Sequence, residues 1–595
     1  MKPLNDSKRL FDCIEYHLEN SPLEDMLAAK EKGVWIKYST QQVAGYINDL
    51  SAGLLALGIS CGDMTVENRN KIAVVSKNRP EWLILDMAVQ RIGAVLTPVY
   101  PTITINELEF ILNDSEVKMV FVNDAQLFSK ISAIRHRLPF LIDIYSFEPE
   151  DGVKLWKEIL SLSTPEMLST ASVIADKIKY EDIATIIYTS GTTGTPKGVM
   201  LSHKNILSNV LACLPCFPPG DNLRALSFLP LNHIFERMVS YLYLYKRTSI
   251  YYAESLEAIG ENIREIKPHI FTTVPRMLEK VYDKIMAKGR ELTGVKRKLF
   301  FWAHTLATTF DLKDRSVFYN IQLSIADKLI FSKWREALGG RLVCIISGGA
   351  ACQARLIRIF TAAKIPIMEG YGLTETSPVI SVNRFNEKLR MIGSVGPLIN
   401  EVEVKIAADG EILCKGPNVM MGYYKQPVLT AEVFDNGWFK TGDIGMMVNN
   451  GFLKITDRKK EMFKTSGGKY VAPLPIENKL KESIYVENIM VIGAGQKYAA
   501  ALIVPSFANL REWCKTKGVV YTTDAEMILQ QNVIEMYRDL VDSFNDFFNS
   551  FEQIKKFQLL PRDWSVETGE MTPKLSLKRK VIMEKYNEVV EKIYG

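Results

Sequence analysis

Long apolar runs, clustered cysteines and a large net charge are all missing from this chain of 595 residues. It has no stretch of about 18 apolar residues, the length that a membrane-spanning helix needs. Its first residues also lack the uninterrupted apolar segment of a secretory signal. The 73 Lys and Arg residues exceed the 68 Asp and Glu residues by only five, which does not indicate a dedicated nucleic-acid binder. We therefore expect no export, no membrane span and no nucleic-acid partner.

The eight cysteines are dispersed, and most lie in apolar or strand-like stretches, as expected for a reduced, cytoplasmic protein. Cys213 and Cys216 have the spacing of a redox or zinc motif. No second Cys/His pair lies near them in the sequence, and no thioredoxin-like pattern precedes them. We interpret the two as small apolar side chains in a loop.

Hydrophobic residues make up 47% of the chain and charged residues 24%, the usual balance of a globular protein with a large core. Short apolar runs alternate with amphipathic helical stretches, which predicts an α/β fold rich in parallel strands. Strands are expected at residues 72–76, 117–122, 183–188, 270–274, 342–346 and 365–368. A helix is expected at 82–91, followed by a Gly/Pro break at 93–101.

The pattern changes twice along the chain. Residues 284–338 are helical and rich in aromatics, including Leu299-Phe-Phe-Trp302, and fit either a membrane-surface element or, as we favour, an inserted helical pair that packs on the domain. Short strands with turn signals predict a β-rich subdomain at about 393–456. We expect a large domain at 1–456, followed by a small, mobile α+β domain at 457–595.

The clearest local signal is residues 188–198, Tyr-Thr-Ser-Gly-Thr-Thr-Gly-Thr-Pro-Lys-Gly, directly after an apolar strand. Its backbone N–H groups, its hydroxyls and the ammonium of Lys197 are suited to phosphate oxygens. The common nucleotide-hydrolase loop has Ser or Thr after its lysine, whereas here Gly198 follows. We therefore predict a phosphate-binding loop of another kind.

With this loop, the chain resembles the adenylate-forming enzymes, which include acyl-CoA synthetases, luciferases and the adenylation domains of peptide synthetases. The resemblance continues through residues 370–376 (Gly-Tyr-Gly-Leu-Thr-Glu-Thr), 440–443 (Lys-Thr-Gly-Asp) and 457–461 (Asp-Arg-Lys-Lys-Glu). The four motifs occur in the family's order and at about its spacing. Together they are far more specific than any one of them.

The resemblance implies roles for particular residues. Glu375 would hold Mg²⁺ against ATP oxygens, a role that suits a carboxylate, and Thr374 would donate to the α-phosphate. Lys460 would be the hinge between the two domains.

The residues expected to bind ATP or coenzyme A are Thr189, Ser190, Gly191, Thr192, Thr193, Gly194, Lys197, Gly349, Ala350, Tyr371, Gly372, Thr374, Asp443, Arg458, Lys460, Lys464, Gly467 and Gly468. Of these, Gly349, Ala350 and Tyr371 would line the adenine pocket, Asp443 would bind the ribose, and Gly467 and Gly468 would approach pantetheine. The expected catalytic residues are Thr189, His233, Glu375 and Lys574, and the expected cofactors and substrates are ATP, Mg²⁺ and coenzyme A.

His233 and Glu236 stand three residues apart, a spacing that by itself is more often a satisfied pair than a metal site, and no third ligand is apparent. The resemblance places His233 beside the acyl carboxylate and the phosphate loop. We adopt that role, without a metal.

Within the family, the chain looks most like the bacterial long-chain fatty acyl-CoA ligases. The features responsible are 231–236, 273–276 (Thr-Val-Pro-Arg), the helical insertion and 469–478. The resemblance implies ATP-dependent ligation of a long-chain fatty acid to coenzyme A through an acyl-adenylate. The alternatives are a medium-chain or aryl acyl-CoA ligase and a non-catalytic nucleotide-binding relative. Peripheral contact with the inner face of the membrane, and the choice between monomer and homodimer, stay open.

The C-terminal segment departs from the family pattern. Aligning residues 577–580 (Leu-Lys-Arg-Lys) with the family's basic run places Ser576 where relatives have a catalytic lysine. Lys574 lies two residues earlier and, on an extended segment, shares a face with Ser576. We predict Lys574 as the functional lysine, with Lys578 as the other candidate. The remaining alternative is that all these lysines form a solvated basic tail.

Overall fold

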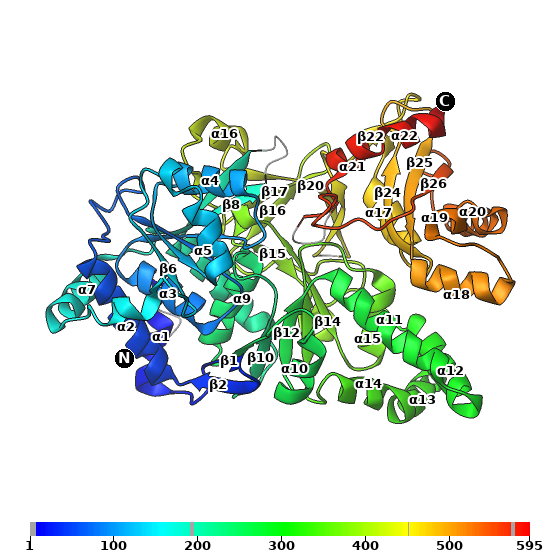
Figure 1. Ribbon diagram of the computed structural model, residues 1–595. Helices are drawn as coiled ribbons and strands as arrows, with labels where there is room; N and C mark the ends of the chain where they lie inside the picture. The colour runs from blue at the N-terminus through cyan, green and yellow to red at the C-terminus, as the bar shows by residue number, and fades with distance from the viewer. Residues whose placement is uncertain (1–6, 191–194, 314, 450, 573–576) are drawn as a thin grey trace.

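The computed structural model describes residues 7–190, 195–313, 315–449, 451–572 and 577–595, and two eight-stranded sheets form the centre of its larger part (Figure 1). The first sheet has the order β18-β9-β8-β4-β3-β5-β6-β7, and its strands from β8 to β7 run parallel. Its strands are β3 (Lys71–Val75), β4 (Val95–Val99), β5 (Val117–Val122), β6 (Asp143–Ser146), β7 (Lys154–Leu155), β8 (Ile183–Ser190), β9 (Pro196–Ser202) and β18 (Gly422–Tyr423).

The second sheet has the order β15-β14-β13-β12-β10-β11-β1-β2, parallel from β14 to β1 with an antiparallel strand at each edge. It comprises β1 (Leu27–Glu31), β2 (Val34–Tyr38), β10 (Arg224–Ser227), β11 (Ser249–Tyr252), β12 (Ile270–Thr273), β13 (Cys344–Ser347), β14 (Ile367–Gly372) and β15 (Val379–Val382). The expected fold class, an α/β protein with parallel-rich sheets, is confirmed.

In the larger part of the chain, helices pack against both sheets. All of these helices except α16 lie before residue 363. They are α1 (Asp12–Asn20), α2 (Thr40–Ala56), α3 (Pro80–Arg91), α4 (Ile105–Asp114), α5 (Ala125–Ser132), α6 (Trp156–Leu160), α7 (Pro165–Lys177), α8 (His203–Cys213), α9 (Ile234–Tyr245), α10 (Ile259–Ile266), α11 (Pro275–Glu291), α12 (Gly294–Thr308), α13 (Val317–Ala326), α14 (Ser332–Ala337), α15 (Ala354–Ala362) and α16 (Pro427–Glu432). Among the described residues, none of the helices has the length and apolar character needed to cross a bilayer.

The β-rich subdomain is a five-stranded antiparallel sheet of β16 (Glu403–Ile406), β17 (Glu411–Lys415), β19 (Phe434–Asp435), β20 (Trp438–Val448) and β21 (Phe452–Arg458). The expected domain boundary after residue 456 falls inside β21 and stays a prediction.

The C-terminal part, at the upper right in Figure 1, has its own core under a three-stranded sheet. It contains β22 (Phe463–Lys464), β23 (Tyr470–Val471), α17 (Pro473–Leu480), β24 (Val486–Ile492), β25 (Ala499–Pro505), α18 (Phe507–Lys517), α19 (Asp524–Met527), α20 (Gln531–Asn545), β26 (Ile554–Leu559), α21 (Arg579–Lys585) and α22 (Asn587–Tyr594).

The Gly/Pro break expected at 93–101 is wrong, because Val95–Val99 form the buried strand β4. Proline is rarely found in a central strand since it lacks an N–H donor. β4 pairs with β8 only at Leu96. Pro98 is therefore tolerated, because no hydrogen bond from its backbone nitrogen to β8 is needed.

The insertion at 284–338 was expected to be a pair of helices. It consists instead of the end of α11, followed by α12, α13, the π-helical turn η4 (Asp327–Phe331) and α14. Packing of the insertion is confirmed. Phe300 is buried 5.9 Å from the ring of Trp334, and a Cβ on Gly289 would lie 2.1 Å from the Phe300 ring. Gly289 therefore lets α11 and α12 approach closely.

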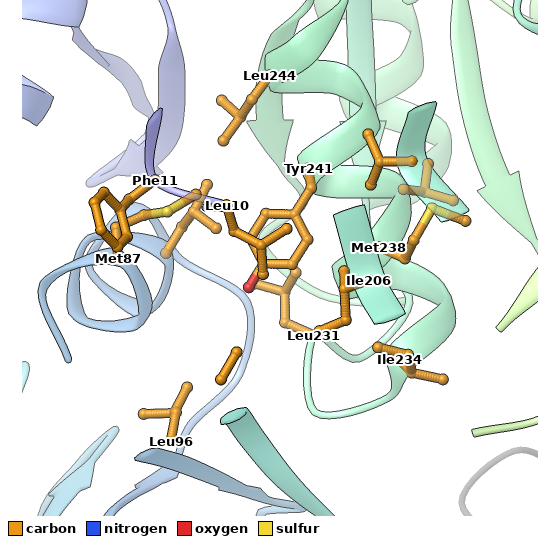
Figure 2. Close-up of a cluster of buried hydrophobic side chains, with 14 of the residues drawn as sticks. Leu10, Phe11, Met87, Leu96, Ile206, Leu231, Ile234, Met238, Tyr241 and Leu244 are labelled. Carbon is orange, nitrogen blue, oxygen red and sulfur yellow. The ribbon is translucent and has the colours of Figure 1, made fainter. Parts of the chain in front are cut away.

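The core between α3, α8 and α9 holds one charged pair. Figure 2 shows the ring of Tyr241 among Leu10, Leu231 and Ile206. Arg237 Nε donates to Asp86 Oδ2 at 3.1 Å, and Arg237 Nη1 donates to Thr185 Oγ1 of β8 at 2.7 Å. Both charged side chains are fully buried. The pair therefore ties α9 to α3 and to the strand that leads into the predicted phosphate loop.

Candidate functional site

Lys197 and Glu375 come from distant parts of the sequence and meet at one tyrosine. The Nζ atom of Lys197, on β9, lies 5.1 Å from the centre of the Tyr423 ring. The hydroxyl of Tyr423 donates to Glu375 Oε1 at 2.9 Å. β18 places Tyr423 there by pairing with Val199 of β9. Tyr423 is a site residue that sequence reasoning missed, although it lies in the conspicuous run Gly422-Tyr-Tyr424.

The predicted phosphate loop is described only at its two ends. Thr189 lies opposite Lys197 in the β8–β9 ladder, and Ser190 lies opposite Pro196. Residues 191–194, which include the predicted ligands Gly191, Thr192, Thr193 and Gly194, lie outside the described residues. The ladder therefore brings the backbones of Thr189 and Lys197 side by side.

The turn that carries Thr374 and Glu375 is held by backbone contacts. Met420 N–H donates to the carbonyl of Glu375 at 2.8 Å, and the Asn418 side chain donates to the carbonyl of Thr376 at 3.0 Å. A Cβ on Gly372 would lie 1.6 Å from the carbonyl oxygen of Pro378, so only glycine fits there. The turn is therefore packed closely against the segment that follows it.

Tyr371 and Asp443 form a second polar pair. The hydroxyl of Tyr371 donates to Asp443 Oδ2 at 2.7 Å, and Arg458 Nε lies 3.5 Å from Asp443 Oδ1. Burial raises the pKa of Asp443, while Arg458 and Tyr371 act in the opposite direction. The β20–β21 register places Arg458 opposite Asp443. Three residues predicted from separate motifs thus lie together.

An apolar cavity with about 740 Å³ of empty space, part of it open to solvent, borders these polar groups. Three of the residues predicted to bind the nucleotide, Gly349, Tyr371 and Gly372, also line this cavity. Its lining includes His233, Phe235, Met238, Val239, Leu242, Cys344, Ile346, Met368, Val379 and Val382, together with Cys213, Cys216, Phe217 and Pro218. Size and lining suit a mainly apolar ligand.

The interpretation of Cys213 and Cys216 as loop residues needs correction. Cys213 ends α8, and Cys216 belongs to the 3₁₀ turn η3 (Leu214–Cys216), so both lie on helical backbone. Burial raises the pKa of both thiols. Both side chains line the apolar cavity, which agrees with their expected role as small apolar groups.

His233 lines the same cavity and is the N-cap residue just before α9. Its Nδ1 accepts from the N–H of Phe235 at 3.1 Å, which orients the ring. Glu236 is not among the residues that line the cavity. Its side chain is fully buried and accepts a hydrogen bond from the Thr272 hydroxyl. Among the described residues, no group of three His, Cys, Asp or Glu side chains could hold a metal ion.

Burial of Glu236 predicts a pH-dependent stability. Burial raises its pKa from 4.5 to about 7, although the hydroxyls of Ser227 and Thr272 oppose the shift. A pKa raised on folding stabilises the protein below the unfolded value and loses that contribution as pH rises towards the folded value. We expect Glu236→Gln to exceed wild type in stability by up to about 3 kcal/mol at pH 8, and to differ little near pH 4.5.

Thermal unfolding midpoints at the two pH values measure this effect. The exposed Glu432→Gln is the matched control and should leave the pH dependence unchanged. A Glu236→Gln variant that tracks wild type at both pH values would contradict the assignment. Glu369, whose pKa burial also raises to about 7, keeps part of the wild-type pH dependence in the variant.

The motif that ends at Arg276 lies where the two parts of the chain meet. Arg276 pairs with Glu487 of the C-terminal part and, at 3.0 Å, with Glu279. Gln353 Nε2 donates to the carbonyl of Lys481 at 3.4 Å. These contacts hold the C-terminal part in the observed orientation.

The predicted hinge and coenzyme A residues lie beyond β21. Gly467 and Gly468 form the exposed tip of the β22–β23 hairpin, where Gly468 has a φ of +80°. Lys464 lies in the same hairpin, with its Nζ 5.5 Å from the centre of the Tyr470 ring. Among the described residues, no hydrogen bond joins this hairpin to Glu375, Tyr371 or Asp443, where side-chain hydrogen bonds instead join Tyr371 to Asp443 and Tyr423 to Glu375.

The C-terminal basic run is only partly described. Lys574 and Ser576 lie outside the described residues, and Lys578 is exposed. The alternative of solvated lysines therefore stays open, but their neighbour Arg579 is engaged in ion pairs. Its Nη2 donates to both carboxylate oxygens of Glu477, at 2.7 and 2.6 Å, and its Nε lies 3.1 Å from Glu461.

The fold and the site define a class of two-part α/β proteins in which charged and hydroxyl groups border an apolar cavity. Solved structures share the fold, and two of them are compared below. The anthranilate CoA ligase AuaEII, in complex with anthranoyl-AMP, has a TM-score of 0.73 at 18% identity over 97% of both chains. A fatty acyl CoA synthetase of Mycobacterium tuberculosis has a TM-score of 0.63 at 22% identity over 98% of this chain and 99% of the other.

Sequence comparison then identifies the family. Residues 16–424 match the AMP-binding enzyme family, and residues 461–595 match the AMP-binding enzyme C-terminal domain. The chain belongs to the AMP-binding enzyme family. It is 32% identical to the long-chain-fatty-acid–CoA ligase FadD15 of Mycobacterium bovis over 95% of this chain and 93% of the relative. It is 31% identical to the long-chain-fatty-acid–CoA ligase 1 of Homo sapiens over 94% of this chain and 82% of the relative.

Proposed function

We propose that this protein joins a long-chain fatty acid to coenzyme A, using ATP and releasing AMP and pyrophosphate through an acyl-adenylate. The observation that supports this most is the apolar cavity bordered by Gly349, Tyr371 and Gly372, since it would place an apolar chain next to the predicted nucleotide site. The names of the similar long-chain-fatty-acid–CoA ligases support the same substrate.

In the first half-reaction, the fatty carboxylate attacks the α-phosphorus of ATP and pyrophosphate leaves. We assign the phosphates to Thr189, Thr374 and Lys197, whose hydroxyls and ammonium stabilise the developing negative charge. Lys574 would add its ammonium at the reacting carboxylate. The Tyr371–Asp443 pair would orient the adenosine, with Asp443 accepting from the ribose hydroxyls. His233, oriented by its bond from Phe235, would face the acyl carboxylate from the cavity wall.

Glu375 fits Mg²⁺ as a single protein ligand. Its carboxylate is half-buried and accepts a hydrogen bond from Tyr423, and Mg²⁺ prefers such oxygen ligands. Since no group of three metal-binding side chains is found among the described residues, the remaining ligands would be phosphate oxygens and water. When bound, Mg²⁺ would neutralise negative charge on the phosphates.

In the second half-reaction, the thiol of coenzyme A displaces AMP and forms the thioester. We propose that the C-terminal part rotates about Lys460 between the steps, so that Gly467 and Gly468 approach pantetheine and water is excluded from the mixed anhydride. The Arg276–Glu487 pair would have to break in this rotation. We further propose a cytoplasmic enzyme that contacts the inner face of the membrane peripherally.

Pyrophosphate release with palmitate, octanoate, benzoate and acetate tests the substrate class. Each additional buried methylene contributes about 0.8 kcal/mol, so kcat/KM should be higher for palmitate than for octanoate by about tenfold or more. A maximum at octanoate or benzoate would favour the medium-chain or aryl ligase. Absence of pyrophosphate release with every acid, while ATP still binds, would favour the non-catalytic relative.

A further inference from the structure

The helical insertion exposes an apolar stripe that the protein core does not use. Val317, Phe318, Ile321 and Ile325 of α13 and Leu329 of η4 are exposed by 78, 70, 55, 48 and 42%. At 100° per residue, the four residues of α13 fall within an arc of about 100°. We call these five residues the outer face of α13. Figure 1 places α13 at the lower right edge of the molecule, between α12 and α14.

The opposite side of the same helix is already packed. Ala326 and Phe331 are fully buried, and the Tyr319 hydroxyl donates to the carbonyl of Leu306 at 2.7 Å. Leu323 and Ile330 pack against the same core. The fold of the insertion therefore does not require apolar residues on its outer face. Large apolar side chains that gather on an exposed surface mark an interaction site.

The charge of the insertion indicates what covers this face. Residues 284–338 contain 11 Lys and Arg against 5 Asp and Glu, a net charge of +6, whereas the whole chain has +5. The other 540 residues therefore carry a net charge of −1. The positive excess of the chain lies in the segment that exposes the apolar stripe.

Among the described residues, two acidic residues of the insertion are engaged in ion pairs. Asp327 pairs with Arg335 and Lys364, and Asp311 pairs with Arg358 at 3.0 Å. Lys296, Lys298, Lys328 and Lys333 are exposed and make no ion pair among the described residues. These lysines are thus available to an anionic partner.

We propose that the outer face of α13 is a docking surface for an anionic phospholipid bilayer, with the exposed lysines of the same insertion contributing attraction to the head groups. An exposed apolar helix face flanked by lysines is the pattern of helices that lie in the membrane interface. A second copy of the chain fits less well, because a two-fold contact would bring two segments of net charge +6 together. The inference deepens the proposed function, since long-chain fatty acids partition into lipid bilayers, and it names the surface of the proposed membrane contact.

Cosedimentation of the full chain with phosphatidylcholine vesicles, with and without phosphatidylglycerol, tests the surface. We expect binding that requires phosphatidylglycerol and weakens with salt. The double variant Phe318→Ser/Ile321→Ser should reduce binding by about tenfold or more, and Lys296→Gln/Lys298→Gln by about fivefold for each lysine. The matched control is Val520→Ser, which removes a side chain that is 85% exposed in the C-terminal part and should bind like wild type.

Wild-type binding by the Phe318→Ser/Ile321→Ser variant overturns the proposal. So does a wild type that ignores vesicles but forms a dimer that the variant loses, which assigns the face to a second copy. Acyl-CoA formation from detergent-dispersed palmitate, without vesicles, is measured in parallel and should be unchanged in both double variants. If wild type forms no acyl-CoA in this assay, the proposed function is refuted, whereas the vesicle-binding measurement still tests the docking surface.

Discussion

Glu375→Gln is expected to lower the rate of acyl-adenylate formation by about 10²–10³-fold, the effect of removing one group that stabilises transition-state charge. Glutamine has nearly the same shape and can still accept the hydrogen bond from Tyr423 Oη. It lacks the negative charge that would attract Mg²⁺ beside the phosphates. The thermal unfolding midpoint should therefore stay near the wild-type value while catalysis is lost.

Pyrophosphate release from ATP and palmitate measures this loss, and thioester formation from preformed acyl-adenylate provides the comparison reaction. The second half-reaction should be affected much less, because pyrophosphate has already left. Tyr423→Phe, which removes only the hydroxyl that donates to Glu375, should have a smaller effect than Glu375→Gln. Near-wild-type pyrophosphate release by Glu375→Gln would remove Glu375 from the metal site.

Asp86→Ala is expected to destabilise the protein by about 3–5 kcal/mol, because it leaves Arg237 charged and without its carboxylate partner in the core. Arg237, Asp86 and Tyr241 are all fully buried, so water cannot replace the lost carboxylate without opening the core. The same change removes an acceptor for Gln90 Nε2, which lies 2.8 Å from Asp86 Oδ1. The effect should appear as a lower midpoint in thermal unfolding.

A double variant separates the loss of the pair from the cost of an isolated buried charge. Asp86→Leu/Arg237→Met replaces both partners with apolar side chains and should recover a large part of the stability lost in Asp86→Ala. Arg237→Met alone should resemble Asp86→Ala in direction. An Asp86→Ala midpoint within about 1 °C of wild type would show that the pair does not stabilise the core.

Local sequence signals were sufficient where an element carries its own pattern. The strand expected at residues 117–122 is β5 with the same limits, since five of its six residues, all but Lys118, are apolar and favour a buried strand. β4 escaped prediction because Pro98 is a strong breaker signal locally, and only the limited pairing with β8 makes it tolerable. β1 was missed for a different reason: its parallel partner β11 lies more than 200 residues away.

In the candidate site too, some residues could be named from the sequence, whereas others depend on contacts between distant segments. Lys197 could be named from the composition of its loop, and Glu375, Tyr371, Asp443 and Arg458 from the family resemblance that their motifs carry. Tyr423 could not be named, because its role depends on the pairing of β18 with β9. The partners of Arg579 could not be named either, because only the fold brings Glu477 and Glu461 to it.

The sequence by itself determined the α/β class, the family resemblance and most of the candidate chemical groups, since these follow from local periodicity and short motifs. Only the tertiary structure decided which groups meet. It joined Tyr371 to Asp443, and Lys197 to Glu375 through Tyr423. It also buried Phe300 while leaving Phe318 exposed, although both are phenylalanines in helices of one insertion. Burial and contact depend on segments far apart in the chain, and a local pattern cannot specify them.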